Sequence, residues 1–170
     1  LGILFEFLKE NATLWVLGKG DNKIQFLSAF DLFKMTEKSF KLSGKNIFNI
    51  GTEKVLTFKE TFEFLIKKTN SKSKVKHFNK FFGLLFLKIL SILRLINFID
   101  YHNKLLVSNI VMDISRIKKV LKYKPTKSNA DLLLEAYNYY IKNNNKSESG
   151  SAKKPKMGLF SLIKFISKYI

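Results

Sequence analysis

The stretch ATLWVLGKGDNKIQFLSAFDLF contains two strand signals followed directly by a helix signal. This order is the sequence feature that most restricts which folds the chain can adopt. ATLWVLG (12–18) is apolar and ends at a glycine, and the turn after it contains Gly20, a residue type that adopts positive φ without steric cost. KIQFLSA (23–29) alternates apolar and polar side chains, so we expect a strand that pairs with the first one. Asp31 begins a helical segment, where a carboxylate favours the positive end of the helix dipole. Short strands joined closely to helices predict an α/β domain.

The rest of the chain has more helix signals than strand signals. Thr57 and Glu60 have the spacing of a capping box, and Ser128 and Asp131 mark a similar helix start. The predicted helices are 1–10, 57–69, a segment that starts at Asp113 or Ser115 and stops before Pro125, and 128–143. We also expect a short buried strand at 46–50 and another just before Asp113. The predicted architecture is therefore mostly helical with a few short strands.

Residues 78–99 are apolar almost all round, with Lys88, Ser91 and Arg94 in one stripe. A membrane-spanning helix needs about 18–20 apolar residues with few or no charges. Lys88 and Arg94 interrupt this segment in its middle, so the pattern favours a buried or interface helix over a membrane span.

The chain has 170 residues, of which 46% are hydrophobic, enough for one domain with a core plus an appendage. We expect residues 1–143 to form the domain, 144–157 to be a flexible basic linker, and 158–170 to be a separate amphipathic helix. The sequence starts inside the apolar run LGILFEFL, without Met or a signal peptide, which is typical of the middle of a longer protein.

The formal net charge of +18 is a weak indication of a nucleic-acid partner. Every basic residue except Arg94 and Arg116 is lysine, whereas nucleic-acid binders favour the bidentate fork of arginine. The absence of cysteine excludes disulfides, thiolate-bound zinc and thiol nucleophiles, and two histidines are too few for a histidine-based metal site.

Four motifs, in order along residues 1–143, together resemble the extended short-chain dehydrogenase/reductases, the NAD-dependent epimerases and dehydratases of nucleotide sugars. GKGDNKIQFLSAFDL is similar to that family's G-x-G-x-N-R-x-Q-F-V-H-V-x-D-L, with Lys23 and Ser28 in place of Arg and His. NIFNIGTEKVLTFKETFEFL resembles its next landmark, a strand ending in Y/F-N-I-G and then a helix that starts at a Thr. MDISRIKKVLKYKP resembles D-x-S-K-A-x-x-x-L-G-W-x-P, with Lys122 where the family has Gly, and SNADLLLEAYNYYIKN resembles the closing helix.

The resemblance implies that this chain is the C-terminal, substrate-binding portion of such an enzyme. The family's G-x-x-G-x-x-G turn, which holds the dinucleotide at the start of a Rossmann domain, is missing, because Gly18 and Gly20 have no third glycine. Tyr123 and Lys127 match the catalytic Tyr-x-x-x-Lys spacing, but Pro125 between them prevents the shared helical face. We therefore expect no catalytic residue and no cofactor bound by this chain alone, with NAD or NADP in the full-length protein and an N-terminal Rossmann half as partner.

The same resemblance suggests which residues contact a nucleotide-sugar substrate. It places Trp15 and Leu17 beside the base, Lys23 at the diphosphate, Gln25 at a hydroxyl and His102 at the sugar. Each has a structural alternative: Trp15 as core, Lys23 as a solvated turn residue, Gln25 in strand pairing, and His102 as an ordinary structural histidine. The sugar and the reaction type within the family stay open.

The basic tail leaves two further interpretations open. A basic amphipathic helix at 158–170 suits an anionic membrane surface, or it docks on its own domain or on a second subunit of a homodimer. We expect a cytoplasmic protein with this capacity for membrane-surface association. The alternatives to half of an enzyme are a non-catalytic module that binds a nucleotide sugar or a protein partner, and a peripheral membrane protein.

Overall fold

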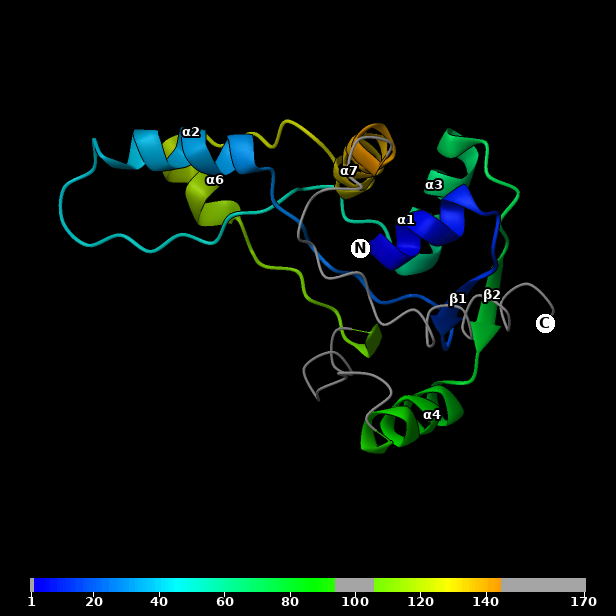
Figure 1. Cartoon of the computed structure of the whole chain (residues 1–170). Coiled ribbons are helices and arrows are strands. Elements are labelled where there is room, and N and C mark those ends of the chain that lie inside the picture. Colours follow the sequence, from blue (N-terminus) through cyan, green and yellow to red (C-terminus); the bar gives the residue numbers. More distant parts are fainter. Residues whose placement is uncertain (1, 94–105, 145–170) are drawn as a thin grey trace.

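The computed structural model describes residues 2–93 and 106–144, and these form helices around a small parallel sheet (Figure 1). The elements, in chain order, are α1 (Gly2–Lys9), β1 (Leu14–Leu17), α2 (Ala29–Ser39), α3 (Phe58–Thr69), β2 (Val75–Phe78), α4 (Lys80–Ile92), α6 (Ser115–Leu121) and α7 (Asn129–Asn144). This mixed α/β class, mostly helical with short strands, agrees with the prediction. His102 and residues 145–170, which include most of the predicted linker and all of the predicted tail helix, lie outside the described residues.

The sheet within the described residues joins β1 and β2 in parallel, with Leu14 opposite Val75 and Leu17 opposite Phe78. Parallel strands require a long crossover, which α2 and α3 provide here. The sequence patterns missed β2, and the expected pairing of 23–29 with 12–18 is wrong. Gly18 and Gly20 have φ of +64° and +66° and carry the chain away from β1, so Ile24 forms an isolated parallel bridge with Ile110 instead.

One hydrophobic core lies where α1, α3 and α7 meet β1, because each of these elements turns its apolar face inward (Figure 1). Its buried members are Phe7, Leu8, Ala12, Leu14, Leu65 and Leu133. On β1 the side chains alternate between buried and half-buried, so Leu14 and Val16 enter the protein interior and Trp15 and Leu17 lie on the other face.

A second core joins α2 and α6 through Met35, Ile117 and Leu121, with Tyr123 beneath them. The segment 46–50 runs beside this core, but it forms no strand, and Ile47 is 82% exposed. The predicted buried strand is therefore wrong for this chain, because the segment has no neighbouring strand among the described residues to complete its backbone hydrogen bonds.

The helix starts follow the predicted caps closely, with two corrections. Thr57 and Glu60 form the expected capping box, and the Ser128 hydroxyl donates to the Asp131 carboxylate at 2.6 Å while accepting from the Asp131 N–H. The cap of α2 is Ser28, whose Oγ accepts from the Asp31 N–H, so Asp31 lies one turn inside the helix and is buried.

Helix α6 begins at Ser115, but the expected cap at Asp113 or Ser115 is wrong, because its N-cap is Ile114, which makes no side-chain cap hydrogen bond. Asp113 accepts hydrogen bonds from the backbone and side chain of Ser115 at 2.8 and 2.9 Å, and these bonds hold the pKa of its carboxyl below the usual range. At the other end Lys122 has φ of +52°, the left-handed conformation that glycine adopts most easily. This left-handed conformation explains why glycine suits this position in the family that the sequence resembles.

The apolar segment 78–99 is described as far as residue 93 and contains α4. The expectation of a buried or interface helix is only partly met: Gly83 and Leu90 are buried, while most other apolar side chains of α4 are exposed. In the described part of the chain, no helix has both the length and the apolar character needed to cross a membrane.

Candidate functional site

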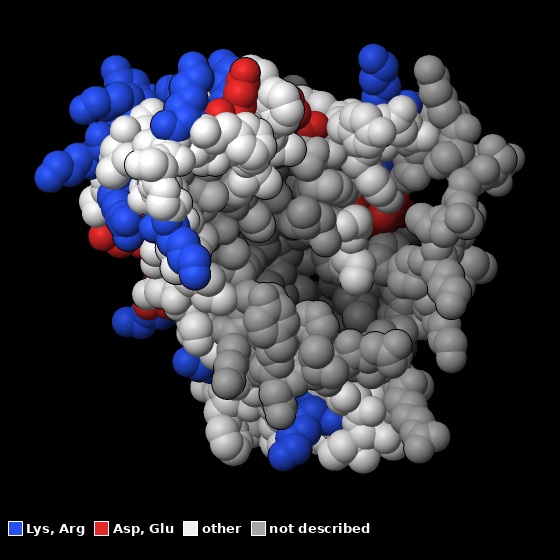
Figure 2. Space-filling view, turned by 90° about the vertical axis from the view of Figure 1, so that its left-hand side faces the viewer, with Lys and Arg blue, Asp and Glu red and all other residues white. Residues whose placement is uncertain are grey.

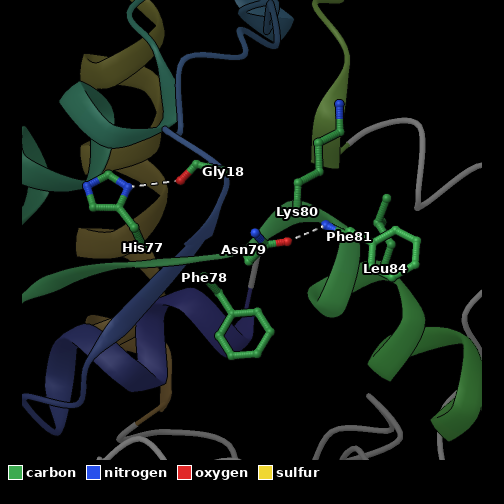
Figure 3. A pocket seen from close by; sticks show the side chains of 7 residues that line it. All are labelled: Gly18, His77, Phe78, Asn79, Lys80, Phe81 and Leu84. Carbon is green, nitrogen blue, oxygen red and sulfur yellow. Dashed lines mark hydrogen bonds between the residues drawn. The ribbon is translucent and has the colours of Figure 1, made fainter.

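A cavity of about 640 Å³ opens where the carboxyl ends of β1 and β2 meet the start of α4 (Figure 3). Because both strands run in the same direction, their ends lie side by side, and this is where open α/β sheets commonly bind ligands. The lining residues are Gly18, His77, Phe78, Asn79, Lys80, Phe81 and Leu84.

His77 fixes one wall of the cavity. Its Nδ1 lies 3.0 Å from the carbonyl oxygen of Gly18, so the ring protonates Nδ1 and donates to that carbonyl when it is neutral, leaving Nε2 as an acceptor. Gly18 also donates its N–H to the Phe78 carbonyl at 2.8 Å, which closes the end of the sheet. In Figure 3 His77 and Phe78 leave β2 on opposite sides, as successive strand residues do.

The opposite wall is the first turn of α4. The Oδ1 atom of Asn79 accepts from the N–H groups of Phe81 and Phe82 at 2.9 and 3.4 Å, which caps the helix (Figure 3). Lys80 follows the cap and is exposed, so its ammonium group and the positive end of the helix dipole share this wall. This wall suits a negatively charged group.

The cavity therefore offers groups that can bind a ligand, and His77 is the described lining side chain that can also transfer a proton. Phe78, Phe81 and Leu84 offer apolar surface to a ring, and Lys80 offers a positive charge to a phosphate. No carboxylate or tyrosine is among the described residues that line it. Among the described residues there is also no cluster of three His, Asp or Glu side chains that can hold a metal ion.

Trp15 and Leu17 lie on the face of β1 nearest to this cavity without lining it. The Trp15 ring meets Phe78 edge-on at 6.1 Å, and the Nζ of Lys76 lies 5.5 Å above it. Leu17 packs under α4, where a Cβ placed on Gly83 would lie 2.3 Å from its Cδ2. Both residues support the cavity wall, and their contact with a base stays a prediction.

Lys23 and Gln25 lie on the segment that bridges to Ile110, away from the lining residues. The N–H of Lys23 donates to Asn109 Oδ1 at 2.8 Å, and its carbonyl accepts from Ile110 at 2.7 Å. Gln25 donates to the Thr52 carbonyl at 2.6 Å and accepts from the Met112 N–H at 2.9 Å. The amide of Gln25 therefore joins three segments, and the substrate contacts of both residues stay predictions, as does that of His102.

Asn129 is a buried polar residue that no sequence pattern singled out. It is 2% exposed; its Oδ1 accepts from the Phe26 N–H at 2.7 Å and from the Thr52 hydroxyl at 2.8 Å, and its Nδ2 donates to the Ile24 carbonyl. One side-chain amide thus pairs with the backbone of 24–26 as a neighbouring strand would.

Tyr123 and Lys127 have separate partners in the structure. The buried Tyr123 hydroxyl lies 3.3 Å from Asp31 Oδ2 and 3.1 Å from the Gly51 carbonyl, and burial together with the charge of Asp31 raises its pKa. Lys127 forms an ion pair with Glu135 at 2.5 Å. Tyr123 is therefore held in its neutral form and has no basic partner.

The glycine turn after β1 does not fit a dinucleotide. A pyrophosphate site needs a helix N-terminus directly after the glycines, whereas here residues 21–28 form no helix and the next helix, α2, begins only at Ala29. A Cβ on Gly20 would lie 3.0 Å from Val16 and 3.2 Å from Lys59, so this glycine serves close packing. We derive no step that uses NAD from these residues.

The sequence patterns did not single out most of the residues that line the cavity. His77 lies in VKHF, a strand too short and too rich in lysine neighbours to show a pattern. Asn79 could have been predicted as a helix cap, because an asparagine just before a long apolar run is typical of that position.

No family model matches this sequence. The protein y4nG of Sinorhizobium fredii is 30% identical over 141 residues, which cover 83% of this chain and 36% of that protein. The chain thus spans about a third of the length of this curated relative.

Several solved structures share this fold over part of their length. UDP-glucose 4-epimerase from Thermotoga maritima, solved with UDP-glucose, has a TM-score of 0.60 at 17% identity and matches 84% of this chain and 39% of its own. dTDP-glucose 4,6-dehydratase from Bacillus anthracis, in complex with NAD, has a TM-score of 0.57 at 16% identity, covering 85% and 39%. UDP-glucuronic acid 4-epimerase from Bacillus cereus, with UDP-glucuronic acid and NAD, has a TM-score of 0.56 at 18% identity, covering 82% and 38%. This chain has the fold of part of these epimerases and dehydratases.

Proposed function

We propose that this chain is the nucleotide-sugar-binding, C-terminal part of an NAD(P)-dependent epimerase or dehydratase. The observation that carries this proposal is the shared fold, together with a cavity at the carboxyl ends of its parallel strands. The fold alone does not imply a function, so the residues of the cavity carry the chemistry. Lys80 and the start of α4 attract the diphosphate, and Phe78, Phe81 and Leu84 face a ring.

Catalysis requires a second part that this chain does not supply. The described residues that line the cavity include no tyrosine or carboxylate, and the glycine turn does not fit a dinucleotide. Hydride transfer between a sugar carbon and the nicotinamide therefore takes place on a complementing Rossmann half, with a tyrosine from that half as the acid or base. The role of this chain is to hold and orient the sugar.

The exposed face of α2 supports docking of such a half. Phe30, Phe33 and Phe40 are exposed on or next to α2, and Ile47 is exposed in the segment after it. The segment 46–50 is short and mostly apolar, and pairing with the edge of a neighbouring sheet would satisfy its backbone. The strand expected there then forms only in the complete enzyme.

Substrate binding is tested by titrating the chain with UDP-glucose and dTDP-glucose and following the fluorescence of Trp15, which packs against the cavity residue Phe78. We expect saturable binding that Lys80→Ala weakens at least about tenfold, because a charge-assisted hydrogen bond contributes about 1.5–3 kcal/mol. Lys88→Ala is the matched control, since it lies on the same helix outside the cavity. Equal affinities of the two variants, or no binding of either nucleotide sugar, would refute the proposal.

The complementing half is tested by the mass of the native gene product, recovered with an antibody to residues 158–170. A product longer by about 100–200 residues, the size of one further domain, is expected. A native product of 19.8 kDa would refute the enzyme interpretation.

A further inference from the structure

The outer side of α4 is an apolar surface. Seven large apolar side chains on α4 or directly after it have exposed fractions between 44% and 70%. At 100° per residue they occupy one continuous arc of about 140° that contains no polar residue. These residues, called here the α4 arc, are Phe81, Phe82, Leu85, Phe86, Ile89, Ile92 and Leu93.

A narrow contact on the opposite side attaches α4 to the body. Gly83 and Leu90 are the buried residues of the helix, and the lack of a side chain at Gly83 lets α4 approach Leu17 and Phe78. Figure 1 shows α4 at the lower end of the molecule, beyond β1 and β2 and apart from the other labelled helices. The α4 arc therefore faces away from both cores.

The charge next to the α4 arc is positive. Lys88 is exposed and lies directly beside one edge of the α4 arc, and no Asp or Glu occurs in the sequence between Glu63 and Asp100. In Figure 2 lysine and arginine side chains gather along the upper part of the face, and others lie at the lower end, at the height of α4 in Figure 1. The arc and its rim thus combine apolar and cationic groups.

We propose that α4 docks in the surface of an anionic lipid bilayer, with the α4 arc among the acyl chains and Lys88 at the headgroups. A helix of 13 residues is about 20 Å long, which is too short for a hydrocarbon core of about 30 Å but suits an interfacial position. A second copy of this chain would bring a second Lys88 to the contact, and the two like charges would repel each other. Anionic lipid has the opposite charge and therefore fits the rim.

The test is co-sedimentation of the full chain with vesicles of phosphatidylcholine alone or mixed with phosphatidylglycerol. We expect binding to the mixed vesicles that high salt weakens. Phe82→Ser/Phe86→Ser should lower the partition coefficient at least about tenfold, because two exposed rings no longer enter the lipid. Lys88→Gln should lower it about fivefold, from about 1 kcal/mol per basic residue near the surface. Phe33→Ser/Phe40→Ser on α2 is the matched control and should bind as the parent does.

A second measurement keeps the proposal testable if the serine variant folds poorly. The chain has no cysteine, so Phe86→Cys carries an environment-sensitive dye on the α4 arc, and Phe40→Cys carries it on α2. Only the dye at position 86 should shift to the blue with anionic vesicles. The proposal is overturned if the parent does not bind them at low salt, if the α2 and α4 variants lose binding equally, or if Phe82→Ser/Phe86→Ser instead dissociates a dimer.

Discussion

Replacing Asn129 with alanine should destabilise the protein more than any surface change, because this one side chain completes the hydrogen bonds of 24–26. The variant removes the acceptor for the Phe26 N–H and the Thr52 hydroxyl and the donor for the Ile24 carbonyl. Water does not replace them easily, since Asn129 is 2% exposed.

The magnitude follows from the groups left without partners. Each buried polar group without a hydrogen bond costs about 1–3 kcal/mol. The Thr52 hydroxyl can rotate to another acceptor, so two backbone groups remain, and the free energy of unfolding should fall by about 3 kcal/mol or more. This loss is a large part of the total free energy of unfolding of a natural domain, which is roughly 5–15 kcal/mol.

Urea unfolding followed by circular dichroism and by Trp15 fluorescence measures this loss by linear extrapolation. Thr52→Val, which removes a single donor, should cost about 1 kcal/mol. Asn143→Ala is the matched control on the same helix, because its side chain bonds only the carbonyl of Tyr139 at an exposed site, and it should cost under about 0.5 kcal/mol. A loss below about 1 kcal/mol for Asn129→Ala, with an unchanged urea slope, would refute the role assigned to this side chain.

Three further predictions concern backbone conformation, packing and pH. Lys122→Gly should raise stability by about 0.5–1 kcal/mol in urea unfolding, because glycine adopts a φ of +52° without strain; a loss would contradict the strain argument. Gly51→Ala should cost about 1–3 kcal/mol, since its Cβ would lie 2.4 Å from Gln25 Cδ and two hydrogen bonds hold that amide; parent-like stability would mean that Gln25 moves aside freely. Burial and the charge of Asp31 raise the pKa of Tyr123, so the folded protein retains a proton that the unfolded chain loses above pH of about 10, and stability should fall as pH rises past that value. Tyr123→Phe should reduce this alkaline loss in melting scans, and Tyr137, whose pKa is also raised by burial and by the charge of Glu6, should keep part of it; a pH profile identical to the parent's would contradict the role of Tyr123.

The helices were predictable because their signals are local. The capping box of Thr57 and Glu60 needs only residues within one turn, and the same is true of Ser128 and Asp131. Strand pairing depends on residues far apart in the sequence: Leu14 lies opposite Val75, and no pattern near Leu14 selects that partner. The expected hairpin failed for this reason.

Little of the cavity could be predicted from the sequence. The glycine turn after β1 supplies Gly18, but the other lining residues lie in or next to β2 and α4, and β2 was not predicted. The long-range hydrogen bonds of Asn129 left no mark in the local sequence, where SNAD reads only as a helix start.

The small contact at Gly83 that attaches α4 to the body has a consequence for amide hydrogen exchange. Few buried side chains tie this helix to the cores, so it forms a small unit that opens without unfolding α1, α3 or α7. Its amides should exchange faster than those of α3, although its cap is complete. Since Lys80, Phe81 and Leu84 belong to this unit and Gly18 and His77 do not, each opening separates the two walls of the cavity, and any ligand that bridges them slows exchange along the whole of α4.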